Sequence, residues 1–578
     1  MSLTQACSTN IPMEEMQKPV VYQVFTRLFG SDANVNQHDG SRAVNGCGSM
    51  AAFTPQALDE IKRLGVTHIW YTGIIEHATQ TDYSAYGIQR DHHAVVKGKA
   101  GSVYAIKDYY DVDPDIATSV PARMQEFEAL VARTHDAGLK VIIDFVPNHV
   151  ARQYHSDACP EGIEDLGAAD DTTQHFLPTN NFYYFPGQQF QTDFDLRTDE
   201  NEPYYEQPAR ATGNDVFSPF AHHDDWYETV KLNYGVDYLD GRTTHFDPVP
   251  STWEKMTDIL LFWASKGVDA FRCDMAEMVP AEFWNYATTH VREKYPHIQF
   301  IAEIYGPDSY RRYINEGGFD YLYDKVGLYD TLRAVTCGYA NASSISYCWQ
   351  AVDDIRDHML SFLENHDEQR IASDFFAGCG ERGRAAMAVA ATISRGPVMI
   401  YFGQELGERG MDDEGFSGRD GRTTIFDYWT VNSIHRWRNG GKFDGRQLTP
   451  QEVDLQRFYS TLLNLCTKEK TIREGDFYDL MYVNPKSDTF NPHSHYAYLR
   501  RSENEVLLCV ANFSEEDAEL DINLPEHVFE LYSLRPQQQI TATDLLTGQE
   551  QQISFCADSP SRVKVPASNA VLLKMNVR

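Results

Sequence analysis

Eight short apolar segments, separated by helical patterns, recur between residues 20 and 403 of the chain. Their length and their content of β-branched and aromatic residues are typical of buried parallel strands. The expected strands are 20–25, 67–73, 141–145, 268–274, 299–304, 319–324, 361–363 and 397–403. Helical patterns lie between them, including 55–65, 122–138 and 253–267. Eight repeats of strand and helix predict the α/β fold class and, within it, a (β/α)8 TIM barrel.

Two parts of the chain depart from this repeat. The segment between the expected strands at 141–145 and 268–274 is rich in Asn, Asp, Gln, Pro and aromatic residues and lacks long helical periodicity. We therefore expect an irregular domain inserted after strand 3. After a helical pattern at 452–470, alternating apolar and polar segments predict a C-terminal antiparallel β-sandwich. The expected divisions are 1–149 and 236–480 for the barrel, 150–235 for the insert and 481–578 for the last domain.

The charge balance limits the class of partner. The 578 residues include 50 Lys and Arg against 84 Asp and Glu, a formal net charge of −34. Nucleic acids are bound through clusters of Lys and Arg, so we expect no nucleic-acid partner and a neutral substrate. The longest apolar run, 385–394, is too short to cross a membrane, so no membrane span is expected. The sequence does not indicate an oligomeric state.

The cysteines bear on the compartment. Ten cysteines are scattered without CxxC pairs or a regular spacing, so neither a zinc knuckle nor a disulfide framework is expected. Cys273 and Cys466 fall in expected core elements, and free buried thiols suit a reducing compartment. The first residues, MSLTQACSTN, lack the basic and apolar regions of a signal peptide. We therefore expect a cytoplasmic protein; a secretory or lipoprotein leader trimmed before these residues stays open as the alternative.

Three carboxylates follow expected strands. Asp274 ends one strand, Glu303 lies near the end of the next, and Asp367 follows the segment 361–363. Because the carboxyl ends of barrel strands face one pocket, we expect these groups to converge there. Hydrolysis of a glycosidic bond needs such a set, with one protonated acid and one ionised carboxylate beside the anomeric carbon. Arg272, on the same strand face as Asp274, can lower the pKa of that carboxyl group.

The motifs at these strand ends resemble those of the α-amylase family, glycoside hydrolase family 13. The matching segments are Asp144 to His149 for DxxxNH, Gly267 to Asp274 for GxDxxRxD, Glu303 after its apolar strand, and Asn365 to Asp367. The resemblance implies that Asp274 is the nucleophile, Glu303 the general acid/base and Asp367 the acid that stabilises the distorted sugar. It also implies substrate contacts from Tyr104, Asp108, His149, Arg272 and His366. Purely structural roles for the histidines and for Tyr104 stay open.

On this resemblance we expect a retaining α-glycosidase that hydrolyses α-glucosidic bonds in malto-oligosaccharides or starch-like α-glucans through a covalent glycosyl-enzyme. An α-glucanotransferase with the same double displacement is the alternative, because residue types do not show whether water or a sugar hydroxyl attacks the intermediate. A catalytically inactive sugar-binding or chaperone relative is a third possibility, against which the intact triad argues. Four aromatic residues of the insert are expected in its core, with a role as sugar platforms as the alternative: Tyr183, Tyr184, Trp226 and Tyr234.

Many members of the α-amylase family, which these motifs resemble, hold calcium between the barrel and the insert. Asn148, Asn233 and the carbonyl of Met278 match the positions of its oxygen ligands. Lys231, however, stands where an acid often does, and its ammonium can occupy or repel the cation site. We therefore expect that no cofactor is required and that no tight structural calcium is held. If calcium binds, the three matching oxygens are its expected ligands.

Overall fold

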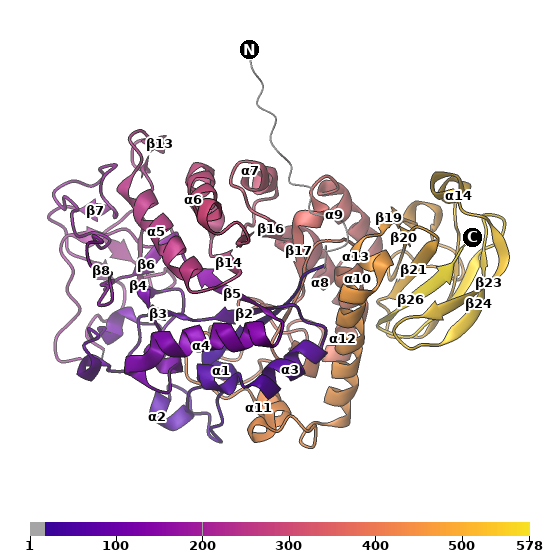
Figure 1. Ribbon diagram of the computed structural model, residues 1–578, viewed down its shortest axis with the longest axis horizontal. Helices are drawn as coiled ribbons and strands as arrows, with labels where there is room; N and C mark the ends of the chain where they lie inside the picture. Colours follow the sequence, from indigo (N-terminus) through magenta and orange to yellow (C-terminus); the bar gives the residue numbers. More distant parts are fainter. Residues whose placement is uncertain (1–17, 199, 578) are drawn as a thin grey trace, which may run out of the picture.

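The computed structural model describes residues 18–198 and 200–577. Its centre is a closed barrel of parallel strands in the order β1-β18-β17-β16-β15-β14-β5-β2 (Figure 1). The strands are β1 (Val20–Phe25), β2 (His68–Thr72), β5 (Lys140–Phe145), β14 (Ala270–Cys273), β15 (Gln299–Ala302), β16 (Tyr321–Tyr323), β17 (Met359–Phe362) and β18 (Val398–Tyr401). Each expected segment forms one of these strands, so the predicted barrel is confirmed.

Helices surround this barrel. They include α3 (Pro55–Arg63), α4 (Arg123–Asp136), α5 (Ser251–Ser265), α6 (Ala281–Lys294), α7 (Tyr310–Asn315), α8 (Asp330–Thr336), α10 (Arg384–Thr392) and α12 (Pro450–Lys468). The long helix α12 begins at a capping box, in which Thr449 and Glu452 satisfy each other's backbone N–H groups. Within the described residues, no helix is both long and apolar enough to cross a bilayer.

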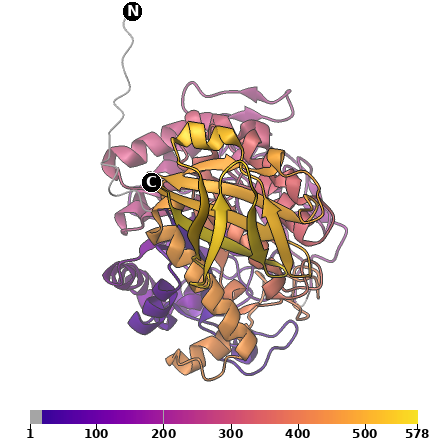
Figure 2. The ribbon, with the colours of Figure 1, turned by 90° about the vertical axis from the view of Figure 1, so that its right-hand side faces the viewer.

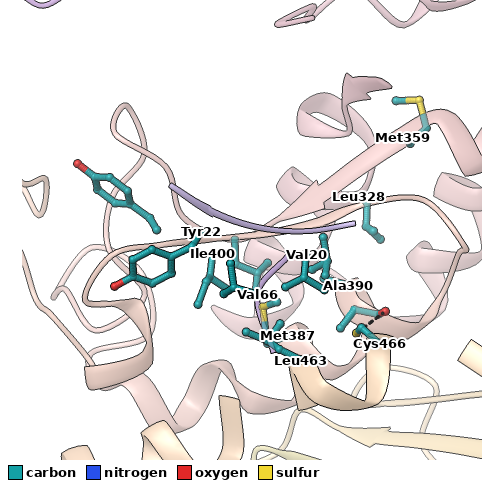
Figure 3. Close-up of a cluster of buried hydrophobic side chains, with 14 of the residues drawn as sticks. Val20, Tyr22, Val66, Leu328, Met359, Met387, Ala390, Ile400, Leu463 and Cys466 are labelled. Atoms are coloured by element: carbon teal, nitrogen blue, oxygen red, sulfur yellow. Dashed lines mark hydrogen bonds between the residues drawn. The ribbon is translucent and has the colours of Figure 1, made fainter. Parts of the chain in front are cut away.

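The core lies between the barrel wall and these helices. Figure 3 shows side chains of β1, β18, α10 and α12 packed together, among them Val20, Tyr22, Ile400, Met387, Ala390, Leu463 and Cys466. All of these side chains are almost completely buried. Burial of apolar area of this kind is the main favourable term in folding, and it holds the strand ends that carry the polar groups in fixed positions.

The connection between β5 and β14 contains short paired strands. β6 (His149–Ala151) pairs antiparallel with β11 (Thr229–Lys231), which joins the start of the insert to its later part. The remaining short strands are β7 (Tyr184–Phe185), β8 (Gln191–Thr192), β9 (Ala209–Arg210), β10 (Phe220–Ala221), β12 (Val236–Asp237) and β13 (Thr243–Thr244). This connection is the expected irregular insert. Its expected end at residue 235 stays a prediction, and the β12–β13 hairpin lies just beyond it.

The C-terminal domain is antiparallel, as predicted. A six-stranded sheet, β19-β20-β21-β26-β23-β24, lies with a two-stranded sheet, β22-β25 (Figure 2). The strands are β19 (Asp476–Asp479), β20 (His495–Ser502), β21 (Glu505–Asn512), β22 (Ala518–Ile522), β23 (Gln537–Asp544), β24 (Glu550–Phe555), β25 (Ser561–Val565) and β26 (Asn569–Asn576). The buried guanidinium of Arg500 donates to the Ile393 carbonyl oxygen at 2.9 Å and so fixes this sheet to the barrel. Figure 1 shows the insert and this domain on opposite sides of the barrel.

Candidate active site

A pocket of about 870 Å³ opens at the carboxyl ends of the barrel strands. The three expected catalytic acids all line it: Asp274 after β14, Glu303 after β15 and Asp367 after β17. Strand register explains why two of them are neighbours. Cys273 pairs with Ala302 across β14 and β15, so the next residue of each strand, Asp274 and Glu303, emerges at the same level.

One guanidinium joins the acids below this pocket. Arg272 is fully buried; its Nη1 lies 2.9 Å from Asp274 Oδ1 and its Nη2 lies 2.8 Å from Glu303 Oε2. Its Nη1 also lies 3.3 Å from Asp144 Oδ1, and its Nε donates to Tyr323 Oη at 3.1 Å. A planar guanidinium held on several sides cannot rotate freely, so Arg272 fixes the spacing of the two carboxylates.

Two further donors orient Glu303. Tyr305 donates its hydroxyl to Glu303 Oε1 at 2.6 Å, and the backbone N–H of Met275 donates to Glu303 Oε2 at 2.8 Å. Met275 adopts a left-handed conformation, with φ 43°, which a residue with a Cβ rarely adopts. Such strain is found at functional sites, where the surrounding structure enforces it. Neither Tyr305 nor Met275 is predicted from the sequence to be part of the site.

The electrostatics of Asp274 differ from the expectation. Burial and the neighbouring Glu303 carboxylate raise the pKa of Asp274 well above its usual range, and the nearby Arg272 opposes this shift without overcoming it. Arg272 thus lowers this pKa as expected, but burial and Glu303 outweigh it, so the pKa of Asp274 is raised overall. The Glu303 carboxylate raises this pKa because like charges held close together in a buried site repel each other.

Asp367 has the opposite shift. Burial works against its ionisation, but His366 Nε2, 3.0 Å from Asp367 Oδ2, and the charges of Arg272 and Arg422 hold the pKa of Asp367 below its usual value. Arg422 also donates through Nε to the Asp367 backbone oxygen at 2.7 Å. Asp367 is therefore ionised at neutral pH and can accept hydrogen bonds from hydroxyl groups in the pocket.

Histidine and tyrosine side chains form another wall of the pocket. The ring of Tyr104 stacks on that of His366, with ring centroids 5.0 Å apart, and Gln23 Nε2 lies 2.8 Å from His366 Nδ1. His149 also lines the pocket; burial and the charge of Lys231 lower its pKa to about 3. His149 is therefore neutral at ordinary pH, with one ring nitrogen able to donate and the other able to accept.

Comparison with known proteins agrees with this geometry. Residues 23–426, more than half of the chain, match the family model described as alpha amylase, catalytic domain. The chain belongs to the α-amylase family. A second model, the C-terminal domain of maltogenic amylase, matches residues 489–545. The family resemblance of the sequence motifs is thereby confirmed.

Individual relatives are distant. Alpha-amylase MalA of Haloarcula japonica is 25% identical over 404 residues, which cover 68% of this chain and 45% of that protein. A cyclomaltodextrin glucanotransferase of Bacillus sp. (strain 38-2) is 24% identical over 452 residues, covering 72% and 52%. The chain thus spans about half the length of these relatives. A maltogenic α-amylase, AmyB, from Thermotoga neapolitana matches with a TM-score of 0.61 at 20% identity, covering 97% and 99%, and shows the shared fold alone.

The structure does not bring Asp108 to the pocket. Asp108 lies in β4 (Ile106–Val112), fully buried, and is not among the described residues that line the pocket. Its carboxylate accepts hydrogen bonds from Ser156 Oγ at 2.6 Å and from the backbone N–H groups of Ala158 and Tyr110 at 2.9 and 2.8 Å. This corrects the expected substrate contact, because Asp108 instead connects β4 to the start of the insert.

Several aromatic residues of the insert lie as expected and one does not. Tyr183, Tyr184 and Tyr234 are buried. Trp226 lines the pocket instead, with its ring 5.2 Å from that of His149. Composition and spacing do not distinguish Trp226 from its buried neighbours, because the insert lacks the periodicity that would assign faces.

An ammonium group stands among the oxygens expected to hold calcium. Lys231 in β11 is buried, and its Nζ donates to Asn148 Oδ1. The same Nζ lies 2.7 Å from Asp215 Oδ1 and 3.4 Å from the Met278 carbonyl oxygen. Calcium needs six to eight oxygen ligands and cannot share this space with an ammonium group. The residues present therefore do not fit a calcium ion at this position.

Asn233, the third expected ligand, is turned to other partners. Its Nδ2 donates to the carbonyl oxygens of Leu177 and Asn180, both at 2.9 Å, and its Oδ1 accepts from the Gly235 N–H at 2.9 Å. These bonds fix a turn within the insert. The expectation that Asn233 joins Asn148 and Met278 in one oxygen set is corrected accordingly.

Proposed function

We propose that the protein is a retaining α-glycosidase that hydrolyses α-glucosidic bonds in malto-oligosaccharides or starch-like α-glucans. The observation that carries this proposal is the attachment of Asp274 and Glu303 to one guanidinium, that of Arg272, at 2.9 and 2.8 Å. Two carboxylates held to the same group favour the narrow spacing of retaining enzymes over the wider gap that admits a water molecule in inverting ones.

The proposed reaction has two steps. In the reactive form Asp274 is ionised and the proton is on Glu303; Asp274 forms a bond to the anomeric carbon while Glu303 gives this proton to the departing glycosidic oxygen. Glu303 then takes a proton from water, which attacks the same carbon and releases the Asp274 carboxylate. Tyr305 and the Met275 N–H keep Glu303 directed at the bond, since both donate to its oxygens. Ionised Asp367 accepts hydrogen bonds from the hydroxyls of the sugar.

An α-glucanotransferase is the second candidate. The similarity to a cyclomaltodextrin glucanotransferase supports it, because transfer uses the same two steps with a sugar hydroxyl in place of water. Product analysis on maltotriose separates the two: glucose and maltose indicate hydrolysis, and longer oligomers indicate transfer. A panel of malto-oligosaccharides, cyclodextrins, isomaltose, pullulan, starch and sucrose then identifies the substrate. No turnover of any of them by the wild type, at the level of the Asp274→Asn control, would leave only the inactive relative.

We also propose that the Lys231 ammonium takes over the cross-linking role of calcium. This proposal is supported by the contacts of the ammonium group with Asn148, on the barrel side, and with Asp215, in the insert. For the cell compartment we propose the cytoplasm, supported by buried free thiols at Cys273, Cys466 and Cys509. Cell fractionation with an antibody against the protein tests this location.

A further inference from the structure

A second groove lies between the barrel and the C-terminal domain. It has a volume of about 600 Å³, and none of the described residues that line it also lines the catalytic pocket. One wall is α9 (Ile345–Ala351) of the barrel, and the other includes β19 and the turn that follows it. Figure 1 shows α9 beside β19, on the side of the barrel that faces the C-terminal domain.

Two tyrosine rings in this groove face solvent. The relative exposure of Tyr347 is 73% and that of Tyr482 is 65%, and both line the groove. Tyr482 is held in place, because its hydroxyl lies 2.6 Å from that of Tyr478, which in turn lies 2.9 Å from His527 Nδ1. An exposed ring fixed by hydrogen bonds presents a flat apolar face at little cost in conformational entropy.

The charge in this groove is already satisfied. Asp479 accepts hydrogen bonds from Ser346 Oγ at 2.6 Å, Trp349 Nε1 at 2.8 Å and Tyr496 Oη at 3.0 Å. It also accepts a hydrogen bond from the Met481 N–H at 2.6 Å, so the groove offers no unpaired carboxylate that would favour a bound cation. No Lys or Arg occurs among the described residues that line the groove, so an anionic ligand is not favoured either.

The surface of this groove combines aromatic faces with neutral polar groups. Gln350, the Tyr347 hydroxyl and His527 offer donors and acceptors next to the exposed rings. A sugar ring has an apolar C–H face and a rim of hydroxyl groups, and this combination matches both parts of the groove. Contiguous exposed apolar surface in a groove is typical of ligand-binding sites.

We propose that this groove is a second, non-catalytic binding site for α-glucan chains. The inference rests on the proposed function, which supplies the class of ligand. A chain bound here keeps other parts of the same polymer near the catalytic pocket and so raises their effective concentration. Short substrates that cannot reach both sites gain nothing from the groove.

The test uses Tyr482→Ala and Tyr347→Ala, singly and together. Tyr339→Ala is the matched control, because Tyr339 is 87% exposed and is not among the described residues of the groove. All variants are first prepared with Asp274→Asn, so that the polymer is not consumed, and their migration is measured in native gels with increasing soluble starch. We expect the apparent Kd for starch to rise about tenfold in the double variant and to stay unchanged in the control. A Tyr482→Trp variant, which keeps a ring, should retain binding.

Hydrolysis by the same groove variants with Asp274 intact separates this inference from the proposed function. We expect unchanged kcat/KM on maltotriose and a reduced rate on starch. Starch binding that is equal in the parent and the double variant would overturn the groove inference, even if maltotriose is cleaved. Starch binding that the groove variants weaken would support it, even if no substrate is cleaved and the proposed function fails.

Discussion

Replacing Lys231 with Met should destabilise the protein by about 3 kcal/mol. The change removes the buried ammonium and leaves Asn148 Oδ1, Asp215 and the Met278 carbonyl without their shared donor. Removal of one partner of a buried ion pair costs roughly 3 to 5 kcal/mol. We expect the lower end of that range, because 31% of the Asp215 side chain is exposed and water can solvate its charge.

Urea unfolding with and without EDTA measures this effect. We expect the free energy of unfolding and the activity of the wild type to be nearly unchanged by chelation, because we propose that the Lys231 ammonium takes the place of calcium between the barrel and the insert. Lys266→Met is the matched control; its ion pair with Glu128 is partly exposed, and its loss should cost at most about 1 kcal/mol. A large loss of wild-type stability in EDTA that calcium alone restores would refute the reasoning, as would unchanged stability of Lys231→Met.

Three further variants test the site and its surroundings. Asp274→Asn should lower turnover by several orders of magnitude while the fold stays intact, and full activity would exclude Asp274 as the nucleophile. Glu303→Gln should be as damaging on maltotriose but much less so on an activated fluoride glycoside, whose leaving group needs no proton; equal losses would argue against the acid role. Burial and the nearby Asp108 and Asp111 raise the pKa of Glu76 to about 9 from 4.5, so its contribution to stability is complete below pH 4.5 and is lost as pH rises through 9. Glu76→Gln should therefore gain up to about 4 kcal/mol over the wild type between pH 5 and pH 8 in urea unfolding, and parallel pH profiles would contradict this.

The barrel and its acids could be predicted because their signals are local. Each strand is a short apolar run, and the acids follow directly after such runs, so topology alone brings Asp274 and Glu303 together. The position of Lys231 at the expected calcium site could also be predicted from the sequence. Lys231 stands two residues before Asn233, in a segment that the family resemblance aligns with the calcium-binding segment of family members. Its contact with Asn148 depends on the pairing of β6 with β11, which only the structure shows.

Other features depend on contacts that spacing does not encode. Asp108 follows Tyr104 by four residues, but β4 has irregular register with β3 (Ile75–His77), and its carboxylate meets the insert at Ser156. The sequence places the positive charge of Arg272 near Asp274 but does not show how deeply the pair is buried, so it does not predict that the pKa of Asp274 is raised overall. Tyr305 could not be assigned to Glu303, since a tyrosine after a strand carries no sign of where its hydroxyl points.

The configuration of the first product tests the central claim most directly. In a retaining mechanism two successive inversions at the anomeric carbon restore the original configuration. Proton NMR spectra recorded during the first minutes of maltotriose cleavage, before mutarotation, should show the newly formed reducing end as the α-anomer. A newly formed β-anomer in those early spectra would contradict a covalent intermediate on Asp274 and with it the proposed mechanism.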